Sequence, residues 1–170
     1  MLFRSDVFGL HFAALDIRQD ASVHGKVWEE IARRTDLVPA NYAELSAEEK
    51  TQLLPRVSGD LGTHLFEDGI VKDTLETIKA IKEVQQYNGQ AGCQRYIISQ
   101  CNSPLNVLEV FGLFRICGWS EEELNIDVIP LFETIDDLKK AGQVMQTLYS
   151  NTIYRNHVKR RGNRQTIMLG

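Results

Sequence analysis

The chain has few cysteines and no long apolar run, and each shortage argues against a class of protein. Its 170 residues include three cysteines, Cys93, Cys101 and Cys117, and no CxxC pair. An odd number without paired spacing argues against a disulfide framework or a zinc site, and favours reduced, buried thiols in a cytoplasmic protein. No apolar run approaches the ~18 residues of a membrane helix. The first residues, MLFRSDVF, lack the apolar region of a secretory signal.

Internal repeats, low-complexity tracts and a strong charge imbalance are also missing. The chain has 19 Lys and Arg against 23 Asp and Glu, a net charge of −4, and 43% of its residues are apolar, which is enough for the core of one domain. One basic cluster interrupts this balance, but no aromatic residue is interleaved with it. We therefore interpret it as a solvated loop, and expect no nucleic-acid or membrane partner. The cluster consists of Lys159, Arg160, Arg161 and Arg164.

Apolar, β-branched runs alternate with helical patterns along the chain. The predicted strands lie at about 7–17, 93–99, 126–132 and 164–169. The predicted helices lie at 22–34, between Ser46 and Pro55, at 70–86, from Ser103 to Gly118, and after Thr134. Such alternation is typical of an α/β fold with parallel strands. Four strands make about half of an eight-stranded TIM-type (β/α) barrel. We expect one unit over 1–170, mostly helical by residue count, with a helical excursion at 20–92.

Local signals predict where helices begin and which faces they bury. Ser46 with Glu49 forms a capping-box pattern, and Ser103 followed by Pro104 forms a typical helix start. Apolar residues at helical spacing define the expected buried faces. These are Val23, Val27 and Ile31 in the helix over 22–34, and Ile135, Leu138, Met145 and Leu148 in the helix after Thr134. The segment 57–69 is rich in loop-forming residues, and we expect it to be the most mobile part.

The four histidines form no catalytic pattern. His11 lies within a strand pattern and is expected to be a core residue with a hydrogen-bond partner. His24 lies inside the helix over 22–34, where we assign it no role beyond packing. His64 and His157 lie in loop or helix-end contexts, and we expect both to face solvent.

Two of the expected strands run into a charged residue. The segment 8–20, FGLHFAALDIRQD, reaches Arg18, and the segment 125–138, NIDVIPLFETIDDL, reaches Glu133. Because ligands gather beyond the carboxyl ends of parallel strands, we expect the two residues to share one site for an anionic, metal-assisted substrate. Asp16 lies on the same strand face as Arg18 and is expected to brace its guanidinium. Taken alone, Arg18 is equally typical of a surface position, and Glu133 of a helix start.

Several strings resemble the phosphoenolpyruvate carboxylase family, in family order and across essentially the whole chain. They are LDIRQ at 15–19, YIIS at 96–99, PLFETIDDL at 130–138, YRNH at 154–157 and NRQTIMLG at 163–170. The resemblance implies an excised internal piece of the catalytic barrel of a much longer lyase. That enzyme carboxylates phosphoenolpyruvate with bicarbonate to oxaloacetate and phosphate, and it uses Mg²⁺ or Mn²⁺. The piece alone is expected to be inactive.

The resemblance also implies roles for individual residues. Arg18 is similar to a catalytic arginine that contacts the substrate's anionic groups, with Gln19 beside it as a weaker candidate, and Glu133 to a metal ligand. Leu131 and Met168 resemble residues of an apolar pocket around the substrate's methylene, although spacing alone favours plain core. The family's second carboxylate ligand belongs to a GYSDSxKDAG-type motif whose first glycine would be the last residue here. The sequence departs from the family at 20–21, where it has Asp-Ala instead of Glu-Ser.

Two alternatives stay open at this point. The chain could belong to a different metal-dependent barrel enzyme of the phosphoenolpyruvate–pyruvate group, or it could be a non-catalytic interaction module. A module predicts an exposed apolar patch rather than charged strand ends. For the enzyme, the family implies a homotetramer, and half a barrel would leave two open sheet edges through which the piece could dimerise. Asp136 and Asp137, in the first turn after Thr134, are expected to cap that helix rather than bind metal.

Overall fold

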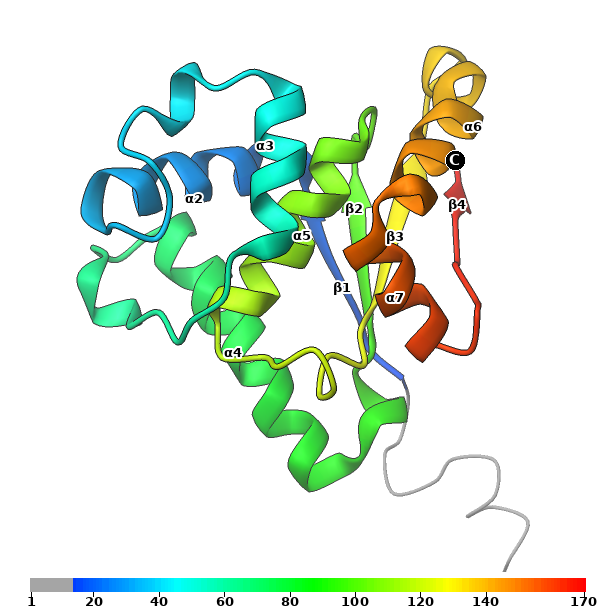
Figure 1. Cartoon of the computed structure of the whole chain (residues 1–170). Coiled ribbons are helices and arrows are strands. Elements are labelled where there is room, and N and C mark those ends of the chain that lie inside the picture. Colours follow the sequence, from blue (N-terminus) through cyan, green and yellow to red (C-terminus); the bar gives the residue numbers. More distant parts are fainter. Residues whose placement is uncertain (1–13) are drawn as a thin grey trace, which may run out of the picture.

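Four parallel strands form one sheet in the computed structural model, which describes residues 14–170. The strands are β1 (Asp16–Asp20), β2 (Arg95–Ser99), β3 (Asp127–Phe132) and β4 (Met168–Leu169). Their order in the sheet follows their order in the sequence, and all three pairings are parallel (Figure 1). The predicted α/β fold with a parallel sheet is therefore confirmed.

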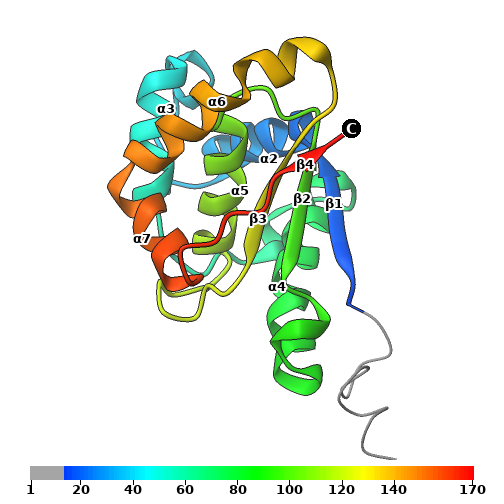
Figure 2. The same ribbon diagram turned by 90° about the vertical axis from the view of Figure 1, so that its right-hand side faces the viewer.

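Helices connect the strands and cover one face of the sheet. They are α2 (Ala21–Arg34), α3 (Ala47–Leu53), α4 (Ile70–Asn88), α5 (Pro104–Ile116), α6 (Ile135–Ser150) and α7 (Thr152–Arg160). Figure 2 shows α3, α5, α6 and α7 on one side of the strands. Helices α2, α3 and α4 lie between β1 and β2 in the sequence. No helix in residues 14–170 has both the length and the apolar composition to cross a membrane.

Helix α5 forms the centre of the core because nine of its 13 residues are buried and none is exposed. A helix that is apolar all round belongs in the interior, and Phe111 and Phe114 are fully buried here. The helix begins after Ser103 with Pro104 in its first turn, as the sequence predicts, and Ser103 also forms a capping box with Asn106. The indole Nε1 of Trp28 in α2 donates to the carbonyl oxygen of Glu109 at 3.0 Å. This contact ties α2 to the central helix.

The two faces of the sheet have different neighbours. Successive strand residues point to opposite faces. Tyr96, Ile98 and Val128 join the main core under the helices. Their alternates Ile97 and Ile129 form a second small cluster, together with Leu131 and Met168. The register places Arg18 beside Ile97, and Ile97 beside Ile129, so that Arg18 lies on the face of the second cluster.

The strand boundaries differ from the prediction at both ends of the sheet. The first predicted strand, 7–17, lies mostly outside the described residues, as does His11. The described strand β1 continues to Asp20, so Arg18 lies within the strand rather than after it. Strand β4 has two residues instead of the expected six. One physical reason is a hydrogen bond from the side chain of Gln165, whose Nε2 donates to the carbonyl oxygen of Val128 at 2.9 Å. A longer β4 would pair with β3 at this point.

Helix boundaries agree well with the local signals, but one buried face was predicted wrongly. In α2, Val27 and Ile31 are buried and Val23 is partly buried; in α6, Met145 and Leu148 are buried. However, Ile135 and Leu138 are 73% and 41% exposed. In Figure 1 the start of α6 lies beyond the end of the sheet, which agrees with this exposure. The cysteines are buried and unpaired, as expected.

Candidate active site

Arg18 and Glu133 meet at the carboxyl edge of the sheet although 115 positions separate them. An Nη2 of Arg18 donates to Oε1 of Glu133 at 3.1 Å. Arg18 comes from β1 and Glu133 follows β3 directly, so the ion pair reaches across the end of β2. The side chains are 53% and 27% exposed, which leaves them accessible to a ligand. The convergence that strand order predicts is therefore observed.

A second donor contacts the other oxygen of the Glu133 carboxylate. The main-chain N–H of Gln100, just after β2, donates to Oε2 of Glu133 at 3.0 Å. Each carboxylate oxygen thus accepts one hydrogen bond from a different strand end. Sequence reasoning missed Gln100 because a backbone donor carries no residue-type signal. Its place one residue after the YIIS strand was the only available indication.

An apolar floor lies beside the ion pair on the same sheet face. Leu131 is buried and pairs in register with the half-buried Met168. Beyond them, the main-chain N–H of Gly170 donates to the carbonyl oxygen of Phe132 at 3.1 Å. A Cβ atom at position 170 would lie 3.4 Å from Cγ of Glu133, so the chain passes close to the carboxylate there.

The structure places two other residues of this region away from the pair. Gln19 alternates with Arg18 along β1 and so points to the opposite face; its Oε1 accepts from the N–H of Asp20 at 2.9 Å. Asp16 pairs with Arg95 at 3.4 Å. Asp16 therefore does not brace the guanidinium of Arg18, because the partner of that group is Glu133.

The family model of phosphoenolpyruvate carboxylase matches residues 1–170. The chain belongs to this family. Similar proteins named phosphoenolpyruvate carboxylase come from Nitrosomonas europaea, 35% identical over 98% of this chain and 19% of the relative, and from Gloeobacter violaceus, 32% identical over 97% and 18%. A third, from Xanthomonas campestris, is 32% identical over 100% of this chain and 19% of the relative. The chain spans about a fifth of the length of these curated relatives. Neither alternative left open by the sequence is favoured.

Membership of this family implies a divalent metal ion. The carboxylate of Glu133 has the donor chemistry that Mg²⁺ and Mn²⁺ prefer. However, residues 14–170 contain no group of three or more His, Cys, Asp or Glu side chains that could hold a metal. Glu133 thus has the donor chemistry of one ligand, without a metal-binding group of three such side chains around it in residues 14–170.

The neighbouring acidic residues of α6 have structural roles. Thr134 and Asp137 form a reciprocal capping box, in which Thr134 Oγ1 donates to Asp137 Oδ2 at 2.7 Å. These hydrogen bonds lower the pKa of Asp137. Asp136 pairs with Lys139 at 3.1 Å. Both observations agree with the prediction that the two aspartates serve the helix start.

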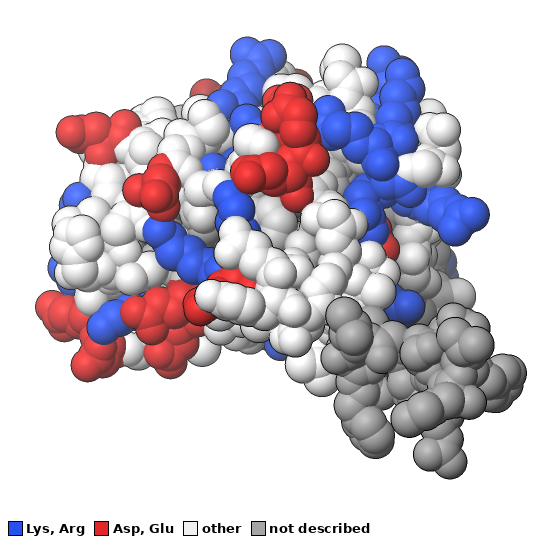
Figure 3. Space-filling model, turned by 90° about the horizontal axis from the view of Figure 1, so that it is seen from below, with Lys and Arg blue, Asp and Glu red and all other residues white. Residues whose placement is uncertain are grey.

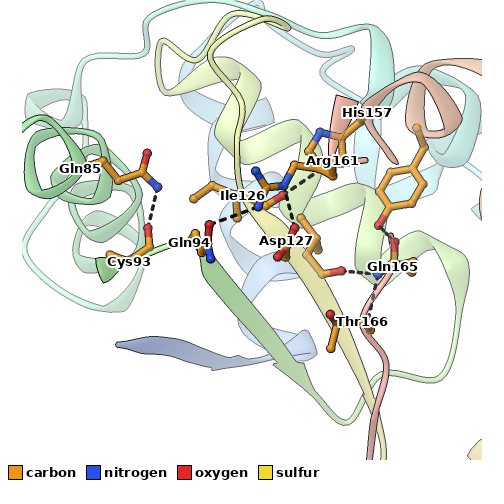
Figure 4. A network of polar contacts seen from close by, with 11 residues as sticks. Gln85, Cys93, Gln94, Ile126, Asp127, His157, Arg161, Gln165 and Thr166 are labelled. Atoms are coloured by element: carbon orange, nitrogen blue, oxygen red, sulfur yellow. Dashed lines mark hydrogen bonds and ion pairs between the residues drawn. The ribbon is translucent and has the colours of Figure 1, made fainter. Parts of the chain in front are cut away.

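Two histidines of the chain are buried. His24 packs under the sheet, and its Nε2 lies 2.9 Å from the hydroxyl of Tyr96. His157 was expected to face solvent, which is wrong: it is buried against Phe111, and its Nε2 donates to the carbonyl oxygen of Ile126 at 3.0 Å (Figure 4). The prediction failed because a position near a helix end is often exposed, whereas the last turn of α7 packs its His157 side against the core. His64 is exposed, as expected.

The basic cluster is not simply a solvated loop. Arg161 donates through Nε to Oδ1 of Asp127 at 2.7 Å and through an Nη to Oε1 of Gln94 at 3.3 Å (Figure 4). Arg160 pairs with Glu121 at 3.5 Å. In the view from below, basic side chains gather on the right of the face, while acidic and basic ones are mixed over the left part (Figure 3). Arg161 thus fastens the end of α7 to the amino ends of β2 and β3.

Proposed function

We propose that this chain supplies the Arg18–Glu133 pair to the active site of a phosphoenolpyruvate carboxylase, which converts phosphoenolpyruvate and bicarbonate into oxaloacetate and phosphate. The observation that carries the proposal is the 3.1 Å contact between a strand-borne guanidinium and a strand-end carboxylate, in a chain that belongs to this family. The carboxyl edge of a parallel sheet is where barrel enzymes place their catalytic groups. The sheet would then be about half of a TIM-type barrel.

Arg18 is the group proposed to bind the substrate's anionic end. A guanidinium has five N–H donors in a planar fork that suits phosphate or carboxylate, and within residues 14–170 Arg18 uses its fork only in the hydrogen bond to Glu133. Gln19 would assist only if its side chain left the Asp20 amide. In the reaction, bicarbonate attacks phosphorus, which forms carboxyphosphate and the enolate of pyruvate. Carbon dioxide released from carboxyphosphate then bonds to the enolate carbon.

The apolar residues beside the pair have a separate task. An enolate that meets water takes up a proton and becomes pyruvate, so the site must keep water away from it. Leu131 and Met168 lie on the face of Arg18 and are proposed to exclude water around the substrate's methylene.

Mg²⁺ or Mn²⁺, held in part by Glu133, would supply the positive charge that stabilises the developing enolate oxygen. The family resemblance puts a second carboxylate ligand in a motif that would begin at Gly170. Because residues 14–170 hold no complete metal site, we propose that the chain alone is inactive. The whole protein is proposed to be a cytoplasmic homotetramer.

Steady-state kinetics of the full-length protein test this function. We expect it to form oxaloacetate and phosphate from phosphoenolpyruvate and bicarbonate. Glu133→Gln should lower kcat/KM by roughly 100-fold or more, since it removes a charge aimed at the reacting centre. Glu122→Gln, an exposed carboxylate far from the pair, is the matched control. Wild-type rates in Glu133→Gln would contradict the assignment, and so would oxaloacetate formation by the 170-residue chain alone.

A further inference from the structure

Gln100 has an unusual backbone conformation next to the candidate site. Its φ is +56°, in the left-handed region that residues with side chains rarely adopt because of steric strain. Within residues 14–170, Asn163 is the only other non-glycine residue with a positive φ. Asn163 has an ordinary reason, because it follows helix α7, its N–H donates to the carbonyl oxygen of Val158 at 3.0 Å, and asparagine tolerates this conformation. No helix ends at Gln100, and glutamine has no such tolerance.

The left-handed turn at Gln100 aims a backbone donor at Glu133. The N–H of Gln100 lies 3.0 Å from Oε2, while the guanidinium of Arg18 lies 3.1 Å from Oε1. Two donors on different oxygens define the plane of the carboxylate as well as its position. One of them, Arg18, is on a long and exposed side chain. The other belongs to the main chain and has no rotamer to change.

The loop after Gln100 holds this donor in place without help from Glu133. Oδ1 of Asn106, in the first turn of α5, accepts from the N–H groups of Asn102 and Ser103, each at 3.2 Å. Cys101 is completely buried beside them. The conformation at position 100 is therefore fixed between β2 and the start of the central helix.

We propose that the main-chain N–H of Gln100 is a positioning group that orients the Glu133 carboxylate for its metal. The inference rests on the proposed function of Glu133. Groups that orient a metal ligand typically contribute 10–100-fold to metal affinity. The exposed side chain of Gln100 has no part in this role, so the test must change the backbone.

An amide-to-ester substitution removes the N–H alone. In the full-length protein, Gln100→Ala keeps the N–H, and lactate at position 100, introduced by nonsense suppression, replaces it with oxygen. Mn²⁺ dissociation constants are measured by electron paramagnetic resonance, together with kcat and KM for phosphoenolpyruvate. We expect the ester to bind Mn²⁺ roughly tenfold or more weakly than Gln100→Ala. The matched control is the same alanine–lactate pair at position 163, which shares the positive φ and should leave Mn²⁺ affinity unchanged.

Glu133→Gln separates failure of this inference from failure of the function. If Glu133→Gln weakens Mn²⁺ binding but the ester at position 100 does not, the positioning role is overturned and the function stands. Equal weakening by the esters at 100 and 163 also overturns it, because the effect is then general. If Glu133→Gln leaves Mn²⁺ affinity unchanged, the function proposed for Glu133 and this inference fall together.

Discussion

Two histidines in the described part of the chain are buried and are held neutral at neutral pH. Burial disfavours the charged imidazolium, and it lowers the pKa of both His24 and His157 from 6.5 to about 4. Arg160 and Arg161 lower the pKa of His157 further, although its bond to Ile126 opposes them. Between pH 6.5 and 4 the unfolded chain binds protons that the folded protein does not. Stability from these residues is therefore complete above pH 6.5 and is lost as the pH falls through that range.

Replacing His157 by glutamine should flatten this pH dependence. Glutamine keeps an N–H donor for Ile126 but does not titrate. From urea unfolding at pH 7 and pH 5, we expect the wild type to lose about 2 kcal/mol more than His157→Gln. His64→Gln is the control, because His64 is exposed, and it should retain the wild-type slope. An unchanged slope in His157→Gln would show that His157 is not held neutral.

The Arg18–Glu133 pair contributes little to stability. Both side chains are partly exposed, and such pairs typically contribute about 0–1 kcal/mol. Substitutions there therefore report on function rather than on folding. The pairing was predictable, since Arg18 lies in one recognisable parallel strand and Glu133 directly follows another. The contribution of Gln100 was not, because backbone conformation decides it and residue type does not.

At the scale of elements, sequence signals correctly predicted the features that depend on neighbouring residues alone. The starts of α3, α5 and α6 were predicted from capping residues, and all three capping boxes are present. Errors arose where a distant segment decides the outcome. The exposure of Ile135 depends on how far the sheet extends, and the shortness of β4 depends on the bond from Gln165 to Val128.

The contact between Arg161 and Asp127 should hold the end of α7 to the sheet. Both side chains are mostly buried, so Arg161→Met leaves the Asp127 carboxylate without its charged partner. We expect a loss of about 1–3 kcal/mol in the free energy of unfolding, measured in urea. Arg164→Met, at an exposed position in the same cluster, should change it by less than about 0.5 kcal/mol. Equal effects of the two substitutions would contradict a structural role for Arg161 and would support the original interpretation of the cluster as a solvated loop.

At the scale of the molecule, the described sheet has two open edges. Within residues 14–170, β1 pairs only with β2, and β4 pairs only with β3. The sequence motifs spread over the whole chain identified its family. They carry no information about which segment or partner chain would cover an open edge of the sheet. Open edges present unpaired backbone groups to other chains.

The 170-residue chain by itself is expected to dimerise through these edges. Sedimentation velocity over a range of concentrations should show a dimer that dissociates on dilution. Leu169→Lys, which places a charge on the β4 edge, should weaken the association. A monomer at every concentration would argue against exposed, adhesive edges.

Exchanging the two charges of the central pair separates an active site from a structural ion pair. The measurement is kcat/KM for oxaloacetate formation by the full-length protein carrying Arg18→Glu, Glu133→Arg or both. Because a cation at 18 and a carboxylate at 133 have different partners in the reaction, we predict that the double variant stays roughly 100-fold or more below wild type, as do the single variants. Recovery of near wild-type kcat/KM in the double variant would contradict the account.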